Sequence, residues 1–197
     1  MIKTFLIAVI SSVIGGVGVY ALTTLDTPTA EDRIADFYAT ENAVHVSPHS
    51  LRKHMGEEGT ILVDLRSPEE YATAHIVGAL NIPAYATPDK SDYGAVDRIV
   101  GAFAELRAKN PDAEIVVYCY SSPCMTGRKV GQMLVEHGIY VKHLGIGWNE
   151  WRYDWDGWNH DGEEIVSAMD YIATGTEPGI FKYAVQGGCP IDGSMGC

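Results

Sequence analysis

The stretch Ile-Val-Val-Tyr-Cys at residues 115–119 is the clearest indication of the fold in this sequence. Such a near-continuous apolar run is typical of a strand that is buried on both faces of a parallel sheet. A second pattern follows over residues 126–137, where apolar side chains recur at helical spacing until Gly138 provides a C-terminal stop. The sequence therefore predicts a buried strand, a short loop and a helix, with Cys119 at the end of the strand.

The same alternation of strand and helix extends to both sides of this stretch. Residues 61–63 are an apolar run that ends in Asp64, and residues 79–83 and 140–144 are predicted as two further short strands. Residues 96–106 carry apolar side chains at the spacing of an amphipathic helix. Strands that alternate with helices through short connections predict an α/β fold, with a parallel sheet covered by helices on both faces.

Two short helices are predicted where a serine precedes a proline. Serine is a favourable N-cap and proline is tolerated in the first turn, so we expect helices to begin after Ser47 and after Ser67. Glu69 and Glu70 would stabilise the first turn of the second helix through the helix dipole. A further small helix is expected over residues 165–173.

The composition restricts the class of protein. With 46% hydrophobic and 20% charged residues, the chain has enough apolar side chains for one folded core. Its formal charge is -12 and its lysines and arginines are scattered, so it lacks the basic patch of a nucleic-acid-binding protein. We therefore expect no nucleic-acid partner, and the sequence implies no cofactor.

The N-terminus predicts export. Residues 5–22 contain no charged residue, and as a helix they would span roughly 27 Å. Lys3 precedes this segment and acidic residues follow it, which orients the rest of the chain outside the cytoplasm, in the periplasm or another extracytoplasmic space. Two interpretations stay open: a signal peptide cleaved near residues 19–21, or an uncleaved anchor that makes the membrane a partner. A buried helix of a soluble domain is the less favoured third.

The four cysteines form two close pairs, and an exported location permits disulfides. Cys189 and Cys197 lie eight positions apart around a proline and two glycines, so we expect a disulfide that closes this loop and stabilises the chain by about 2 to 3 kcal/mol. A zinc site is the alternative, but neither pair has the two-residue spacing of a zinc knuckle. We therefore expect no metal.

These features divide the chain into four parts. Residues 1–22 are the signal peptide or membrane anchor, and residues 23–43, which are polar and acidic, form a linker. Residues 44–157 form the folded domain. Residues 158–197, which are rich in glycine and poor in periodic apolar positions, form a C-terminal extension.

The position of Cys119 suggests chemistry. The carboxyl end of a parallel strand lies at the crevice where open α/β folds bind ligands. Unpaired N–H groups and the dipole of the following helix would converge on the sulfur, which is expected to lower the pKa of Cys119. Arg128 in the first turn would suit an anionic substrate. The alternative is that Cys119 is a small buried hydrophobic residue without a reaction.

Four motifs, in order along the chain, resemble those of the rhodanese family. Val-Asp-Leu-Arg-Ser-Pro-Glu-Glu-Tyr at residues 63–71 and His-Ile-Val-Gly-Ala-Leu-Asn-Ile-Pro at residues 75–83 resemble the two opening signatures. Val-Val-Tyr-Cys at residues 116–119 is similar to the strand that leads into the active-site loop. Leu-Gly-Ile-Gly-Trp at residues 144–148, with Trp151, resembles the closing motif.

The resemblance implies a rhodanese-like fold and a sulfurtransferase. The thiolate of Cys119 would attack the sulfane sulfur of a small donor such as thiosulfate, and the persulfide would pass its sulfur to a thiol or cyanide-like acceptor. Asp64 and Arg66 are implied to be structural, as are His75 and Asn81. The implied substrate-binding residues belong to the loop and the start of its helix: Tyr120, Ser121, Ser122, Met125, Thr126 and Arg128.

The loop departs from the common rhodanese pattern, because Tyr120 and Cys124 stand where basic residues are usual. Cys124, the second candidate catalytic residue, would either resolve the persulfide or form a reversible disulfide with Cys119. A thiol redox module that cycles these two cysteines is therefore one alternative function. A second is a non-catalytic binding domain. A phosphatase or arsenate reductase is disfavoured, since it would need an arginine where Met125 stands.

The tryptophans near the end of the domain allow two interpretations. Trp148 and Trp151 fall inside the closing motif and are interpreted as core residues. With Trp155 and Trp158 they would otherwise form an aromatic platform for a carbohydrate or a cation.

Overall fold

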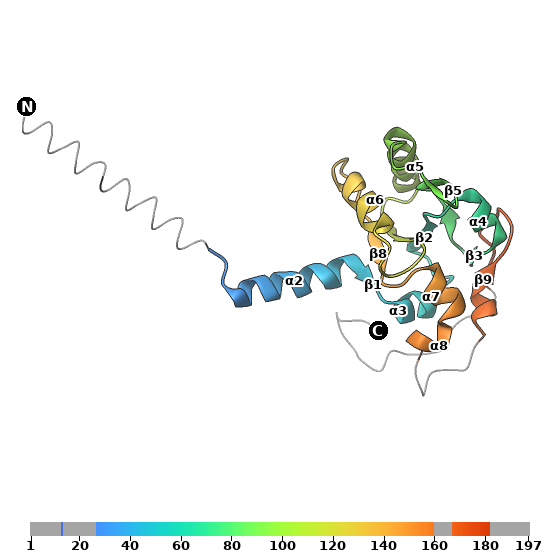
Figure 1. Cartoon of the computed structure of the whole chain (residues 1–197), viewed down its shortest axis with the longest axis horizontal. Coiled ribbons are helices and arrows are strands. Elements are labelled where there is room, and N and C mark those ends of the chain that lie inside the picture. The colour runs from blue at the N-terminus through green and yellow to red at the C-terminus, as the bar shows by residue number, and fades with distance from the viewer. Residues whose placement is uncertain (1–12, 14–26, 160–166, 182–197) are drawn as a thin grey trace, which may run out of the picture. The chain divides into compact units, whose positions relative to one another are not determined.

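The computed structural model describes residues 13, 27–159 and 167–181 (Figure 1). The chain separates into two compact units, residues 1–41 and residues 42–197. Helix α2 (Ala30–Val44) starts in the first unit after Thr29, whose hydroxyl accepts a hydrogen bond of 3.1 Å from the backbone N–H of Asp32. Much of the segment predicted to be a linker is therefore helical.

A five-stranded sheet forms the centre of the second unit, and all of its pairings are parallel. This confirms the predicted parallel α/β architecture. The long pairing between its two central strands places Asp64 beside Tyr118. In spatial order the strands are β1 (His45–Val46), β8 (Lys142–Leu144), β7 (Glu114–Tyr118), β2 (Thr60–Asp64) and β4 (Leu80–Asn81).

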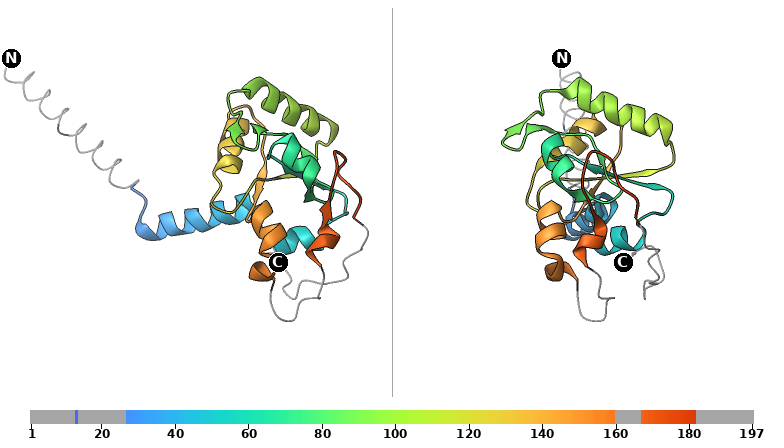
Figure 2. Two further views of the ribbon diagram at one scale, coloured as in Figure 1. Left: turned by 45° about the vertical axis from the view of Figure 1, so that its right-hand side comes forward. Right: turned by 90° about the vertical axis from the view of Figure 1, so that its right-hand side faces the viewer.

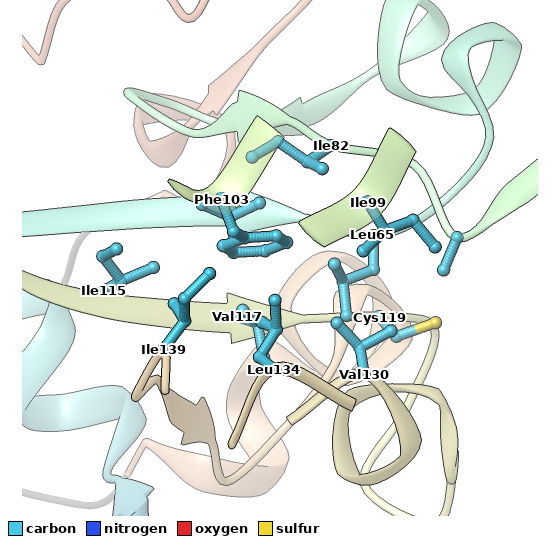
Figure 3. Close-up of a cluster of buried hydrophobic side chains, with 12 residues drawn as sticks. Leu65, Ile82, Ile99, Phe103, Ile115, Val117, Cys119, Val130, Leu134 and Ile139 are labelled. Atoms are coloured by element: carbon cyan, nitrogen blue, oxygen red, sulfur yellow. The ribbon is translucent and has the colours of Figure 1, made fainter. Parts of the chain in front are cut away.

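Successive side chains of β7 face opposite sides of the sheet, as the pleat requires. Val117 and Cys119 belong to a core cluster with α5 (Val96–Lys109) and α6 (Thr126–Val135), whose inward side chains surround them in Figure 3. Both of these helices are predicted from the sequence, although α6 ends two residues earlier than expected. They cover one face of the sheet (Figures 1 and 2).

The other face carries Val116 and Tyr118, which pack in a second cluster with Trp148 and Trp151. Trp151 is fully buried and Trp148 nearly so, which confirms that both are core residues. The elements that contribute to this cluster are α3 (Pro48–Lys53), α4 (Pro68–Thr73), α7 (Trp148–Tyr153), α8 (Trp155–Trp158) and the 3-10 turn η1 (Ala168–Tyr171).

Both predicted serine caps are present. The side chain of Ser47 accepts a hydrogen bond of 3.0 Å from the backbone N–H of Ser50 at the start of α3. Ser67 and Glu70 form a reciprocal capping box at the start of α4. These short helices are therefore specified by local sequence.

Asp64 and Arg66 form a buried ion pair at the end of β2. The guanidinium of Arg66 donates to both carboxylate oxygens, at 2.6 and 3.1 Å, and the hydroxyl of Tyr118 donates to the same carboxylate at 2.6 Å. Both charged side chains are almost completely buried. The side-chain amide of Asn81 donates to the backbone carbonyls of Asp64 and Arg66, so the ends of three neighbouring strands are fixed together.

The segment after residue 166 differs from its prediction. A helix is expected over residues 165–173, and in the described part of that range, residues 167–173, η1 is a single turn capped by Ser167, while β9 (Ile172–Ala173) pairs antiparallel with β3 (His75–Ile76). The backbone N–H of Gly78 also donates to the carbonyl of Pro178 at 2.6 Å. A pairing partner more than ninety residues away leaves no local periodicity, which explains why the sequence pattern was misleading. A separate hairpin is formed by β5 (Tyr85–Thr87) and β6 (Lys90–Ser91).

Two expected features of the fold lie outside the described residues. Only Val13 of the apolar segment at residues 5–22 is described, and neither Cys189 nor Cys197 is. Among the described residues, no helix combines the length and the apolar character needed to cross a membrane.

The buried ion pair predicts a large loss of stability when its acid is neutralised. Asp64→Asn leaves the Arg66 charge buried without a counterion, so the free energy of unfolding should fall by about 3 to 5 kcal/mol. Asp92→Asn breaks a pair with Arg98 that is about two-fifths exposed, and it should cost less than about 1 kcal/mol. Urea unfolding of both variants measures the difference, and equal losses would contradict a structural role for Asp64.

Substitution of alanine for glycine should change the stability of the fold in opposite directions at two positions of α6. A Cβ atom at Gly127 would overlap the buried ring of His143, whereas one at Gly131 would meet only a methyl group of Val141, at 3.9 Å. Gly127→Ala should therefore destabilise the fold by about 1 to 3 kcal/mol. Gly131→Ala should stabilise it by up to about 1 kcal/mol, because alanine favours the helix. Thermal unfolding tests both, and a stabilised Gly127→Ala variant would show that the ring moves freely.

Candidate functional site

Cys119 follows the last residue of β7 and is 1% exposed, with its sulfur beside Val130 of α6 (Figure 3). The start of α7 fixes the backbone here: the N–H of Trp148 donates to the Cys119 carbonyl and the N–H of Asn149 to the Tyr120 carbonyl, both at 2.8 Å. Gly147 allows this approach, since a Cβ atom there would overlap the backbone of Ser121. The closing motif therefore holds the first residues of the loop.

Cys124 returns toward Cys119 through a tight turn. Its N–H donates to the carbonyl of Ser121 at 2.9 Å, and its sulfur lies 3.3 Å from that of Cys119. Both residues are free thiols, and Cys124 is the more exposed of the two. A disulfide would need a separation of about 2.05 Å, so the distance corresponds to a sulfur–sulfur hydrogen bond in the reduced pair.

Three hydroxyl groups lie next to the cysteine pair. The hydroxyl of Thr126, a buried residue, is 3.3 Å from the Cys124 sulfur. It is also 2.6 Å from the hydroxyl of Tyr93 and 3.0 Å from that of Tyr85. We call Thr126, Tyr93 and Tyr85 the hydroxyl cluster. The two tyrosines are not evident from the sequence, because they lie on and after the small hairpin, far along the chain from Thr126.

The two cysteines share one proton unequally. A hydrogen bond from the Cys119 thiol, with further donors at the Thr126 hydroxyl and at the backbone N–H groups of Thr126 and Tyr120, lowers the pKa of Cys124 to about 5. The hydrogen bond to Cys124 and burial raise the pKa of Cys119. This differs from the predicted lowering at Cys119, because the donors near the start of α6 stabilise a thiolate on Cys124 instead.

Two carboxylates contact the cysteine loop or the residues beside it. The hydroxyl of Tyr120 donates to Glu70 at 2.5 Å. The carboxylate of Glu150 accepts from the backbone N–H of Ser122 at 3.1 Å and from that of Gly147 at 2.9 Å. The Ser122 N–H is therefore already engaged by a carboxylate, and it is not one of the unpaired N–H groups expected to converge on the Cys119 sulfur. Neither glutamate was singled out as a site residue.

Arg128 lies against the loop. Its guanidinium donates to the backbone carbonyls of Ser122 and Cys124, at 3.2 and 3.3 Å. Met125 precedes α6 and is largely exposed. The structure thus brings the predicted residues of the loop and its helix around one cysteine pair, whereas the predicted disulfide residues Cys189 and Cys197 lie outside the described part of the chain.

Known proteins are similar to this chain in sequence. A family model described as the rhodanese-like domain matches residues 47–154, more than half of the chain. A curated relative, the HTH-type transcriptional regulator Rv0324 of Mycobacterium tuberculosis, is 32% identical over 146 residues, which cover 71% of this chain and 58% of that protein. The chain therefore spans less than two thirds of that relative.

Several solved structures are also similar. The BH2092 protein from Bacillus halodurans is 24% identical, with a TM-score of 0.46, over 63% of this chain and 82% of that one. A structure described as a rhodanese with anions from E. coli is 22% identical, with a TM-score of 0.32, over 46% of this chain and 89% of that one.

The unequal sharing of the proton predicts which cysteine an alkylating reagent modifies first. Iodoacetamide should modify Cys124 before the buried Cys119, and because only the thiolate reacts, the rate should rise as the pH increases through about 5. Cys119→Ala removes the thiol donor and should move the midpoint to higher pH. Peptide mass mapping of the reduced protein over a series of pH values measures both. A wild-type midpoint near the ordinary thiol pKa of about 8.5 would contradict a stabilised thiolate.

Proposed function

Because this chain belongs to the rhodanese-like domain family, we propose that it is a sulfurtransferase that carries sulfane sulfur as a persulfide on Cys119. The observation that carries the proposal is the reduced pair of Cys119 and Cys124 at the carboxyl end of β7, with sulfurs 3.3 Å apart. One thiol of the pair can lose a proton to the other, so a nucleophile can form without a separate base.

Loading begins with a proton transfer. Cys119 passes its proton to the Cys124 thiolate, the acceptor 3.3 Å away, and becomes the thiolate that attacks. It attacks the sulfane sulfur of a small donor such as thiosulfate. A sulfur–sulfur bond to Cys119 forms, and sulfite leaves with the electron pair of the bond that breaks. The Thr126 hydroxyl and the nearby backbone N–H groups would stabilise the persulfide anion.

The charges around the loop bear on the donor. Glu70 and Glu150 each accept a hydrogen bond from the loop, and the guanidinium of Arg128 is held by loop carbonyls. A dianionic donor such as thiosulfate should therefore bind weakly, and a singly charged alkanethiosulfonate (RSO2S−), which loses a sulfinate when its sulfane sulfur is attacked, is a useful second probe. We propose a thiol or cyanide-like acceptor for the sulfur. The proposal also includes an extracytoplasmic location, which rests on residues 5–22 alone.

A thiol redox module is the second candidate, and the short sulfur–sulfur distance favours it as well. In that function Cys119 and Cys124 would cycle between dithiol and disulfide, and no sulfur atom would be carried.

The proposed loading predicts a mass change that depends on Cys119. The reduced protein is mixed with thiosulfate or an alkanethiosulfonate and quenched at short times, and its mass is measured intact and after digestion. Wild type should gain one sulfur atom on the Cys119 peptide. Cys124→Ser should also gain it, more slowly, because serine is a poor acceptor for the Cys119 proton.

Cys119→Ser is the matched control and should gain nothing. A pair that only forms a disulfide, with no sulfur gained in any variant from either donor, would exclude the sulfurtransferase and leave the redox module. A reduced pair that neither gains sulfur nor oxidises would indicate a non-catalytic binding domain.

A further inference from the structure

We propose that Cys124 is the resolving residue of this site: it displaces sulfide from the Cys119 persulfide, and Thr126 positions it for that step. This inference rests on the proposed sulfurtransferase function, and it adds an activity, the reductive release of the carried sulfur. Four observations on different atoms support it: the sulfur–sulfur separation, the hydrogen bonds of Thr126, the exposure of Cys124 and the carboxylates around the loop.

The distance between the sulfurs suits a displacement. Cys124 lies 3.3 Å from the Cys119 sulfur, which is the atom that a resolving thiolate attacks. Reacting atoms in near-attack geometries are about 3 to 3.5 Å apart, so the loop need not rearrange to bring them together. The turn that fixes Cys124 is held by the Ser121 carbonyl and by Arg128, which binds the Cys124 carbonyl.

The hydrogen bonds that Thr126 accepts orient its own hydroxyl hydrogen toward the Cys124 sulfur. A threonine hydroxyl has one hydrogen and two lone pairs. Burial raises the pKa of Tyr85, so its phenol stays protonated at neutral pH and can donate to Thr126. With Tyr93, 2.6 Å away, donating to the other lone pair, the Thr126 hydrogen is left to donate to the Cys124 thiolate, which lowers the pKa of Cys124. The hydroxyl cluster therefore orients one donor toward the resolving sulfur.

The release step is balanced within the site. After loading, Cys124 holds the proton taken from Cys119, and the persulfide is an anion. The proton moves to the terminal persulfide sulfur, the Cys124 thiolate attacks the Cys119 sulfur, and hydrosulfide leaves with the electron pair of the sulfur–sulfur bond. The sulfane sulfur is reduced, and the two cysteines are oxidised to a disulfide. A dithiol reductant then restores the pair by thiol–disulfide exchange.

The surroundings of Cys124 favour departure of an anion. The carboxylates of Glu70 and Glu150 bind the loop through Tyr120 and Ser122, so the loop that carries both cysteines holds two negative charges. The titratable and charged groups that face Cys124 or its hydroxyl cluster from all sides are Cys119, Tyr85, Tyr93, Tyr120, Arg128 and Lys129.

A single-turnover experiment tests the release. The whole 197-residue chain, reduced and freed of reductant, is mixed with one equivalent of thiosulfate, and with an alkanethiosulfonate in a parallel arm. Sulfide and protein mass are followed over time. Wild type should gain sulfur transiently, release about one equivalent of sulfide per site and end as the Cys119–Cys124 disulfide. Cys124→Ser should keep its persulfide and release none.

The outcomes distinguish a failure of the release step from a failure of the proposed sulfurtransferase function. A wild-type persulfide that lasts as long as that of Cys124→Ser, with no sulfide, would overturn the release and leave the sulfurtransferase intact. A failure of both wild type and Cys124→Ser to gain sulfur from either donor would overturn both.

A second set of variants tests Thr126. Thr126→Val removes the donor, so the midpoint of Cys124 alkylation should move up by about one pH unit and sulfide release should slow about fivefold at the wild-type midpoint. Thr126→Ser keeps the hydroxyl and should restore both. Tyr93→Phe should give a smaller shift, whereas Tyr140→Phe, at an exposed site, should give none. An unchanged pH profile in Thr126→Val would overturn the positioning role.

Discussion

The buried carboxylate of Asp64 is the interaction on which the rest of the domain depends. It joins β2 to β7 through the Tyr118 hydroxyl, and it holds the guanidinium of Arg66 inside the protein. Arg66 in turn donates to the carbonyl of Ala74 at 2.8 Å and lies 4.3 Å above the ring of Trp148. A charge this deep is tolerated because each of its partners is satisfied.

Helix α7 connects the buried pair of Asp64 and Arg66 to the cysteine loop. Trp148, which the Arg66 guanidinium covers, donates its backbone N–H to the carbonyl of Cys119. Glu150 on the same helix binds the N–H of Ser122. The loop is thus fixed at its start by main-chain bonds and in its middle by a side chain, which keeps the two sulfurs at hydrogen-bonding distance. A pre-positioned dithiol of this kind lowers the entropic cost of any reaction between the two sulfurs.

The sequence predicts the central elements well because their signals are local. Apolar runs identify β2 and β7, helical spacing identifies α5 and α6, and serine caps identify α3 and α4. The elements it misses are those whose stability comes from distant partners. β1 has only two residues, and because one of them is His45 there is no apolar run to recognise. β9 forms through its pairing with β3, which is distant in the sequence.

In the candidate site, too, the features with local sequence signals are predicted and those that depend on distant residues are not. The position of Cys119 and the membership of its loop follow from one strand, one helix and the motifs between them. The ionisation of the pair does not, because it depends on hydroxyl groups of Tyr85 and Tyr93 that the fold brings to Thr126 from a separate hairpin. Glu70 is predicted from the sequence only as an acid in the first turn of a helix, and Glu150 is not singled out there at all. Only the structure brings both carboxylates to the loop.

The alternation of side chains along β7 restricts how such a domain can change in evolution. Exchange of one apolar residue for another keeps Val116 and Tyr118 on one face and Val117 and Cys119 on the other. Insertion or deletion of a single residue would exchange the faces, turning the sulfur toward the tryptophans and the Tyr118 hydroxyl away from Asp64. The side chains of the loop after the strand do not alternate between two faces in this way. New substrate preferences can therefore arise through the length and composition of the loop, while the strand that presents the sulfur is closed to insertions.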